Sequence, residues 1–88
     1  MASSTSILHG IRIPAGLWSS TMLPEGILER WIANDGAEVR AGAPVAVVRI
    51  EDALHTLTAP AQGRLNIARP VNSAVEPGAV IGYVAASA

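Results

Sequence analysis

The 88-residue sequence contains no lysine, no cysteine and no phenylalanine. Without cysteine the chain forms neither disulfides nor thiolate metal sites, which is typical of a cytoplasmic protein. The six Lys and Arg positions are all arginines, and an arginine side chain stays charged and is a poor nucleophile. The sequence therefore excludes chemistry that needs a thiol or a lysine amine, and we expect a cytoplasmic location.

Aromatic residues and charge are also scarce. The only aromatic side chains apart from histidine are Trp18, Trp31 and Tyr83, so Val, Ile, Leu and Ala must build the core. Such a core suits closely spaced sheets and leaves little room for a buried substrate pocket. A net charge of −1 gives no basic face for nucleic acid, and no run reaches the roughly 20 apolar residues of a membrane span. We expect neither an independent enzyme nor a partner of nucleic acids or membranes.

The middle of the chain predicts a β-hairpin. Val45–Ile50 and Ala53–Thr58 are rich in β-branched and other apolar residues, and they flank the charged dipeptide Glu51-Asp52. Two such runs separated by a two-residue polar gap are typical of a hairpin with the gap at its tip. Gly and Pro also recur along the chain at intervals of roughly 8–12 residues, which is the spacing of turns typical of an all-β protein.

The remaining strands are predicted from short apolar runs between turn residues. Ala15–Pro24 is predicted as a loop, and no helix of consequence is expected. The helix-like spacing of Leu28 and Trp31 is interpreted as a bulge in a strand. We expect one domain over residues 7–85, with a flexible N-terminal tail at 1–6 and a C-terminal tail at 86–88. The predicted strands outside the hairpin are Ile7–Pro14, Gly26–Asn34, Ala37–Arg40, Arg64–Arg69, a short one at Val75, and Ala79–Ala85.

An internal repeat supports this organisation. Gly26-Ile27-Leu28 recurs 37 residues later as Gly63-Arg64-Leu65, and Val39–Gly42 recurs 36 residues later as Val75–Gly78. Two similar strand–turn–strand–turn–strand units joined by a hairpin can each bury the apolar face of the other. The sequence therefore predicts a flattened all-β sandwich or barrel of two four-stranded antiparallel sheets with a pseudo-two-fold repeat.

Several short motifs, taken in order, resemble the lipoyl/biotinyl carrier domain family over roughly residues 11–84. The first half is similar to the opening of lipoyl domains from dihydrolipoyl acyltransferases, and the hairpin with its following Ala-Pro is shared with biotinyl domains. The resemblance implies the lipoyl-domain fold, with lipoate or biotin carried on a lysine at the hairpin tip. The motifs are Ile13-Pro14, Ser20-Thr21-Met22, Glu25-Gly26-Ile27, Trp31, Asp35-Gly36 with Val39 and Gly42, and Ala59-Pro60 with Gly63.

The resemblance places Asp52 where the family has its modified lysine, seven residues before Ala59. Attachment needs a primary amine that can lose its proton, as lysine can with an unperturbed pKa of about 10.4. No shift of the alignment supplies that amine, because the chain has no lysine. A bias towards arginine explains the missing lysines elsewhere, but it does not explain an acidic residue at the tip. We therefore expect no attached lipoate or biotin.

By this resemblance, the leading hypothesis is a non-catalytic binding or scaffold module beside a 2-oxo acid dehydrogenase or a biotin-dependent carboxylase. The alternative is a lipoyl or biotin carrier component whose acceptor residue is altered here. The residues expected at a docking surface are Arg49, Glu51, Asp52, Ala53 and His55. A solvated tip of mixed charge that merely tolerates Asp52 stays open, as does the oligomeric state.

The other reactive side chains do not predict a catalytic or metal site. His55, Glu51 and Asp52 lack the Cys or further His ligands of structural zinc, and His9 has no close partner in the sequence. The serines lie in tails and turns without the glycine-flanked elbow of a nucleophile. No residue is therefore assigned to catalysis or to a metal.

Overall fold

The structure, a computed structural model, describes residues 6–19, 21–22 and 25–87. Its central hairpin forms as predicted, with β4 (Pro44–Ile50) antiparallel to β5 (Ala53–Thr58). Ile50 lies opposite Ala53, so Glu51 and Asp52 are the two turn residues. Glu51 has a φ of 55° while Asp52 is not among the positive-φ residues, which is the φ pattern of a type II′ turn.

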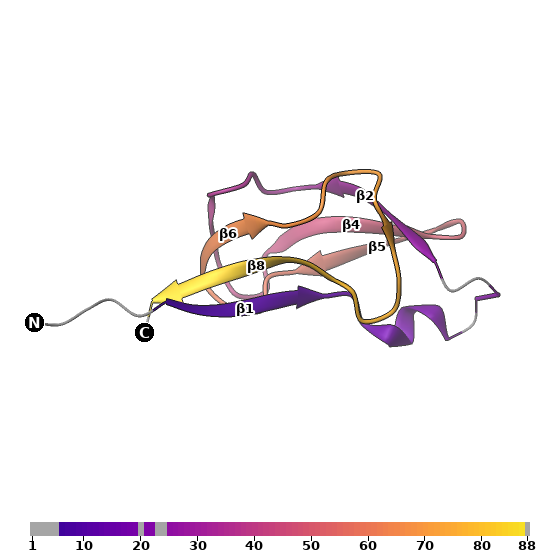
Figure 1. Ribbon diagram of the computed structural model, residues 1–88, viewed down its shortest axis with the longest axis horizontal. Coiled ribbons are helices and arrows are strands. Elements are labelled where there is room, and N and C mark those ends of the chain that lie inside the picture. The colour runs from indigo at the N-terminus through magenta and orange to yellow at the C-terminus, as the bar shows by residue number, and fades with distance from the viewer. Residues whose placement is uncertain (1–5, 20, 23–24, 88) are drawn as a thin grey trace, which may run out of the picture.

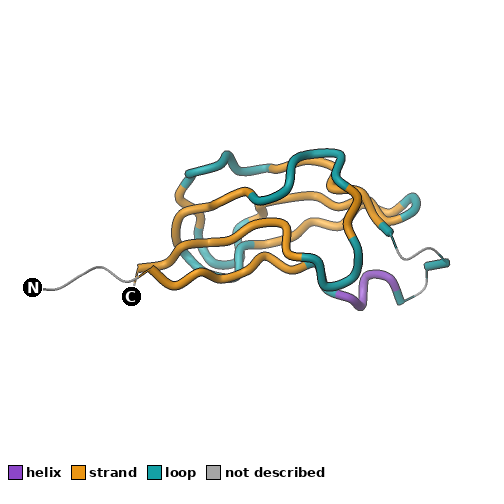
Figure 2. Tube along the Cα trace, in the orientation of Figure 1, coloured by secondary structure: helices purple, strands orange, loops and turns teal. Residues whose placement is uncertain are grey.

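The strands form two four-stranded antiparallel sheets (Figure 1, Figure 2). One has the order β1-β8-β6-β3 and the other β5-β4-β2-β7, which confirms the predicted all-β architecture. The remaining elements are β1 (Ser6–Arg12), η1 (Ala15–Trp18), β2 (Gly26–Trp31), β3 (Glu38–Val39), β6 (Gly63–Ile67), β7 (Ala74–Val75) and β8 (Val80–Ser87).

The predicted internal repeat is a symmetry of the fold. Exchanging β1 with β5, β8 with β4, β6 with β2 and β3 with β7 turns one sheet order into the other. Equivalent backbone hydrogen bonds join the halves: Gly36 N–H donates to Leu65 O at 2.7 Å, and Asn72 N–H donates to Leu28 O at 2.8 Å. Gly36 and Asn72 both have positive φ, of 85° and 73°, in these matching turns. Each repeat therefore donates a hydrogen bond from its turn to the matching leucine of the other.

The core lies between the two sheets and is aliphatic. Leu28 and Leu65, the matching leucines of the two repeats, are both fully buried. Burying a side chain of this size stabilises the fold by roughly 1.5–3 kcal/mol. Trp31 packs against this core from a half-buried position and donates its indole N–H to Arg69 O at 2.9 Å. The largest fully buried side chains are Ile13, Leu28, Ile50, Leu65, Ile81, Val45, Val48 and Val84.

The local predictions hold in part. The bulge is present, because the register between β2 and β4 shifts between Leu28 and Arg30. The strand predicted over Gly26–Asn34 ends at Trp31. Within the segment predicted as a loop, Ala15–Trp18 forms a 3₁₀ turn, since Leu17 N–H bonds to Pro14 O at 3.1 Å.

The sheet extends further towards both chain ends than predicted. Ser6, Ala86 and Ser87, which were expected in the tails, are paired in strands, Ser6 with Ser87 and Ala86 with Ile7. An alternation of apolar and polar residues cannot mark this extension, because Ala85–Ser87 are small and their pairing comes from the backbone. The rest of the predicted tails, residues 1–5 and 88, lies outside the described residues.

Candidate functional site

The tip of the β4–β5 hairpin lies at the opposite end of the sandwich from the start of β1 and the end of β8 (Figure 1). β4 runs towards this end with four consecutive buried residues, Val45–Val48, before exposed Arg49. The anchored strand ends at Ile50, which is 1% exposed, and the chain then turns through exposed Glu51 and Asp52. A rigid buried strand therefore presents the two acidic residues at a surface.

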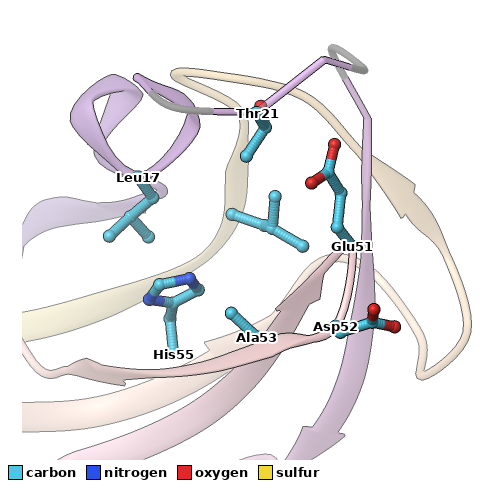
Figure 3. Close-up of a pocket in the computed structure, with 7 residues that line it drawn as sticks. Leu17, Thr21, Glu51, Asp52, Ala53 and His55 are labelled. Carbon is cyan, nitrogen blue, oxygen red and sulfur yellow. The ribbon is translucent and has the colours of Figure 1, made fainter.

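A hollow of about 410 Å³ opens beside the tip (Figure 3). The hairpin supplies one wall, η1 supplies Leu17, and the segment after η1 supplies Thr21. In Figure 3 His55 rises from β5 towards Leu17, while the carboxylate of Asp52 points away from the centre. The lining residues are Leu17, Thr21, Ile50, Glu51, Asp52, Ala53 and His55.

Glu51 connects the tip to the segment between η1 and β2. Its Oε2 accepts a hydrogen bond from the backbone N–H of Met22 at 2.9 Å. A charged acceptor makes this bond stronger than one between neutral groups. Because Glu51 is held on one side by the hairpin turn, the bond fixes the wall of the hollow opposite His55.

Arg49 lies next to this hollow but does not line it. Its Nε forms an ion pair with Glu29 Oε1 at 3.0 Å, between neighbouring strands β4 and β2. Both side chains are roughly half exposed, at 49% and 41%, and an exposed pair of this kind contributes only about 0–1 kcal/mol. Arg49 lines a second, adjacent hollow, together with Glu25, Gly26, Ile27 and Glu51.

The structure therefore brings four of the five expected docking residues to one hollow and places Arg49 in the adjacent one. Glu51 borders both hollows and joins them into one surface. Asp52 makes no hydrogen bond or ion pair with the part of the chain that is described. Within that part, no three acidic or histidine side chains gather as a metal site would require.

Sequence reasoning missed the other side of the site. Leu17 and Thr21 reach the tip only because η1 folds back towards it, and nothing in their spacing indicates this. The backbone N–H of Met22 carries no sequence signal, and the contact of Glu29 with Arg49 depends on the pairing of β2 with β4. These contacts follow from the tertiary arrangement.

A comparison with known protein families matches residues 18–84 to the Biotin_lipoyl family, described as Biotin-requiring enzyme. The chain belongs to this family. Biotin/lipoyl domains carry biotin or lipoate, typically within multienzyme complexes, and are not themselves catalytic. A search of curated proteins gave no match. In the described part of this biotin/lipoyl domain, no helix has the length and hydropathy to cross a bilayer.

The residues of this biotin/lipoyl domain do not fit an attached group. Attachment through an amide needs a side-chain amine, and the sequence has no lysine at the tip or elsewhere. The tip offers the carboxylates of Glu51 and Asp52 and the imidazole of His55, none of which can replace that amine. No step through biotin or lipoate is therefore assigned to this chain.

Proposed function

We propose that this biotin/lipoyl domain is a binding module that carries no group and docks through its hairpin tip. Its partner is a protein of a 2-oxo acid dehydrogenase or a biotin-dependent carboxylase system. The observation that carries the proposal is the combination of an intact carrier frame with a tip that lacks an amine and presents Asp52. The family membership supports the partner class, because such domains sit in multienzyme complexes.

The form of the tip supports recognition by a protein surface. The hollow is lined both by the apolar side chains of Leu17, Ile50 and Ala53 and by polar and charged side chains. The bond from Met22 N–H to Glu51 holds the two walls together before a partner arrives. A preformed surface loses little conformational freedom on binding, so even modest contacts there contribute to affinity.

The charged residues at the tip make the proposed surface negative. No arginine lines the hollow that Glu51 and Asp52 border, and the positive charge of Arg49, in the adjacent hollow, is paired with Glu29. Charge complementarity mainly raises the rate of association and excludes wrong partners. The surface therefore favours a partner that presents basic residues.

The proposal is tested by affinity capture from a lysate of the host, with mass spectrometry of the bound subunits. The baits are the wild type, the tip variant Asp52→Ala with Arg49→Ala, and a control with Glu38→Ala and Arg40→Ala. The control also removes one acid and one arginine from exposed positions, but in β3 of the other sheet and directly after it. We expect the wild type and the control to retain dehydrogenase or carboxylase subunits and the tip variant to lose them. Equal retention by all three baits would contradict docking through the tip.

The alternative is a genuine carrier whose acceptor residue is altered in this chain. It is favoured by the hairpin, whose register is regular from Ala46 to the tip and which still presents residue 52 in a two-residue turn between Ile50 and Ala53. Modification of the Asp52→Lys variant distinguishes the two functions. A carrier frame with an altered acceptor gains a group from a lipoate or biotin ligase, and a tip reshaped for another partner does not.

A further inference from the structure

Strand β1 forms an open edge of its sheet. Among the described residues it pairs only with β8, and Figure 2 shows it along the margin of the sandwich. The edge strands β3 and β7 have two residues each, whereas β1 has seven and β5 has six. A long edge strand presents a row of unpaired backbone N–H and C=O groups that another strand can use.

The β1 edge lacks the features that usually prevent pairing with another chain. Ser6–Ile11 contains no charged residue and no proline, and the register with β8 is regular up to Ile11. Ile7 and Leu8 are large apolar side chains that are 48% and 60% exposed. Natural edge strands are commonly protected by charges, proline or bulges. Ser6–Ile11 has none of these, and the charge of Arg12 and the irregularity between Ile11 and Arg12 lie at the end of the strand.

We propose that two copies of the chain associate through β1, with the strands antiparallel about a two-fold axis at His9. In β1 the odd-numbered residues face the core, as buried Ile11 shows, and the even-numbered residues face outward, as exposed Leu8 shows. Complete overlap of two Ser6–Arg12 strands places each residue opposite a residue of equal parity. The core faces of both copies therefore stay on one side, whereas a shift by one residue would reverse them.

The side chains fit this register. Leu8 lies opposite Gly10 of the second copy, which has no side chain to obstruct it. Gly10 pairs with Tyr83 on β8, and Tyr83 is 38% exposed, so its ring is available to cover the leucine. On the core side Ile7, half exposed in one copy, lies opposite Ile11 of the other. The exposed side chains of Ile7 and Leu8 in one copy thus lie beside Ile11 and Gly10 of the other, and no charged group opposes them.

The charges also fit a second copy. Arg12 is the only charged residue of β1, and in this register it lies opposite Ser6. The two Arg12 side chains therefore lie at opposite ends of the interface and do not repel each other closely. Since β1 runs towards the hairpin end of the sandwich, an antiparallel pair directs the two tips away from each other (Figure 1). The association leaves the tip surface free and does not depend on the function proposed for it.

His9→Cys tests the two-fold axis directly, because the chain has no other cysteine. Residues directly opposite in an antiparallel pair have Cα atoms roughly 4.5–5.5 Å apart, within the range of about 4.4–6.8 Å found for disulfides. With oxidised glutathione as the oxidant, we expect a disulfide-linked dimer on a non-reducing gel. His55→Cys is the control, since His55 is also half-buried, on the other long edge strand. Equal or faster crosslinking of the control would overturn the proposal.

Sedimentation velocity over a range of concentrations provides a second readout. We expect the wild type to dimerise, Leu8→Lys to weaken the association at least roughly tenfold, and Leu54→Lys to leave it unchanged. Leu54 is a fair control because it is 63% exposed on β5 and receives the same substitution. A wild type that stays monomeric throughout, or a loss confined to Leu54→Lys, would overturn the β1 interface. Neither outcome bears on the capture experiment at the tip.

Discussion

The hydrogen bond from Met22 N–H to Glu51 gives the sharpest prediction about the architecture of the tip. Glu51→Ala removes a charged acceptor at 2.9 Å, which costs roughly 1–2 kcal/mol at an exposed position. Alanine also keeps the unfavourable positive φ of 55°. Glu51→Gly loses the same bond but relieves the backbone by roughly 1 kcal/mol. We therefore expect the order of stability to be wild type, then Glu51→Gly, then Glu51→Ala.

Thermal unfolding followed by circular dichroism measures this order. In a domain of this size about 1 kcal/mol corresponds to a shift in Tm of roughly 4–8 °C, so the glycine and alanine variants should be separable. Amide hydrogen exchange at Met22 should accelerate equally in both variants, because both lack the acceptor. Glu76→Ala, at another exposed glutamate, should change neither quantity. Equal Tm values for Glu51→Gly and Glu51→Ala, or an unchanged exchange rate at Met22, would refute the reasoning.

Two further predictions concern the frame behind the tip, and urea unfolding measures both. Leu65→Ala, at a fully buried position, should lower the free energy of unfolding by about 2–5 kcal/mol, whereas Leu54→Ala, at an exposed one, should change it by less than about 0.5 kcal/mol. Gly82→Ala should cost about 1–3 kcal/mol, because its Cβ would lie 2.7 Å from the carbonyl oxygen of Asn66 on the neighbouring strand. Gly16→Ala meets nothing within 4 Å and should be near neutral. Similar effects for either matched pair would contradict this description of the core.

The sequence was sufficient to predict the frame, because the frame depends on local and repeated signals. The pairing of Ile50 with Ala53 follows from two apolar runs around a charged dipeptide. The matching of Leu28 with Leu65 follows from a repeat that the structure converts into a pseudo-two-fold symmetry. The bulge in β2 is also predictable, because the spacing of Leu28 and Trp31 breaks the alternation of apolar residues.

The details of the tip could not be predicted, because they depend on where η1 and the following segment fold. A 3₁₀ turn at Ala15–Trp18 has too few residues to give a periodic pattern. The bond from Met22 N–H to Glu51 joins positions 29 residues apart through a backbone donor that every residue but proline possesses. Separating Arg49 from the other docking candidates needed the register of β2 against β4.

The central claim is that the domain keeps the carrier frame but uses its hairpin tip for docking and no longer as a site for an attached group. It is tested by intact mass spectrometry of the wild type, Asp52→Lys and Arg40→Lys, each co-expressed with a lipoate ligase or a biotin ligase and its substrate. Arg40→Lys adds the same amine at an exposed position away from the tip. We predict that none of the three proteins gains the mass of a lipoyl or biotinyl group, because the tip is shaped for another partner. A wild type that gains this mass would contradict the claim, and so would an Asp52→Lys variant that gains it while Arg40→Lys does not, which would support the altered carrier instead.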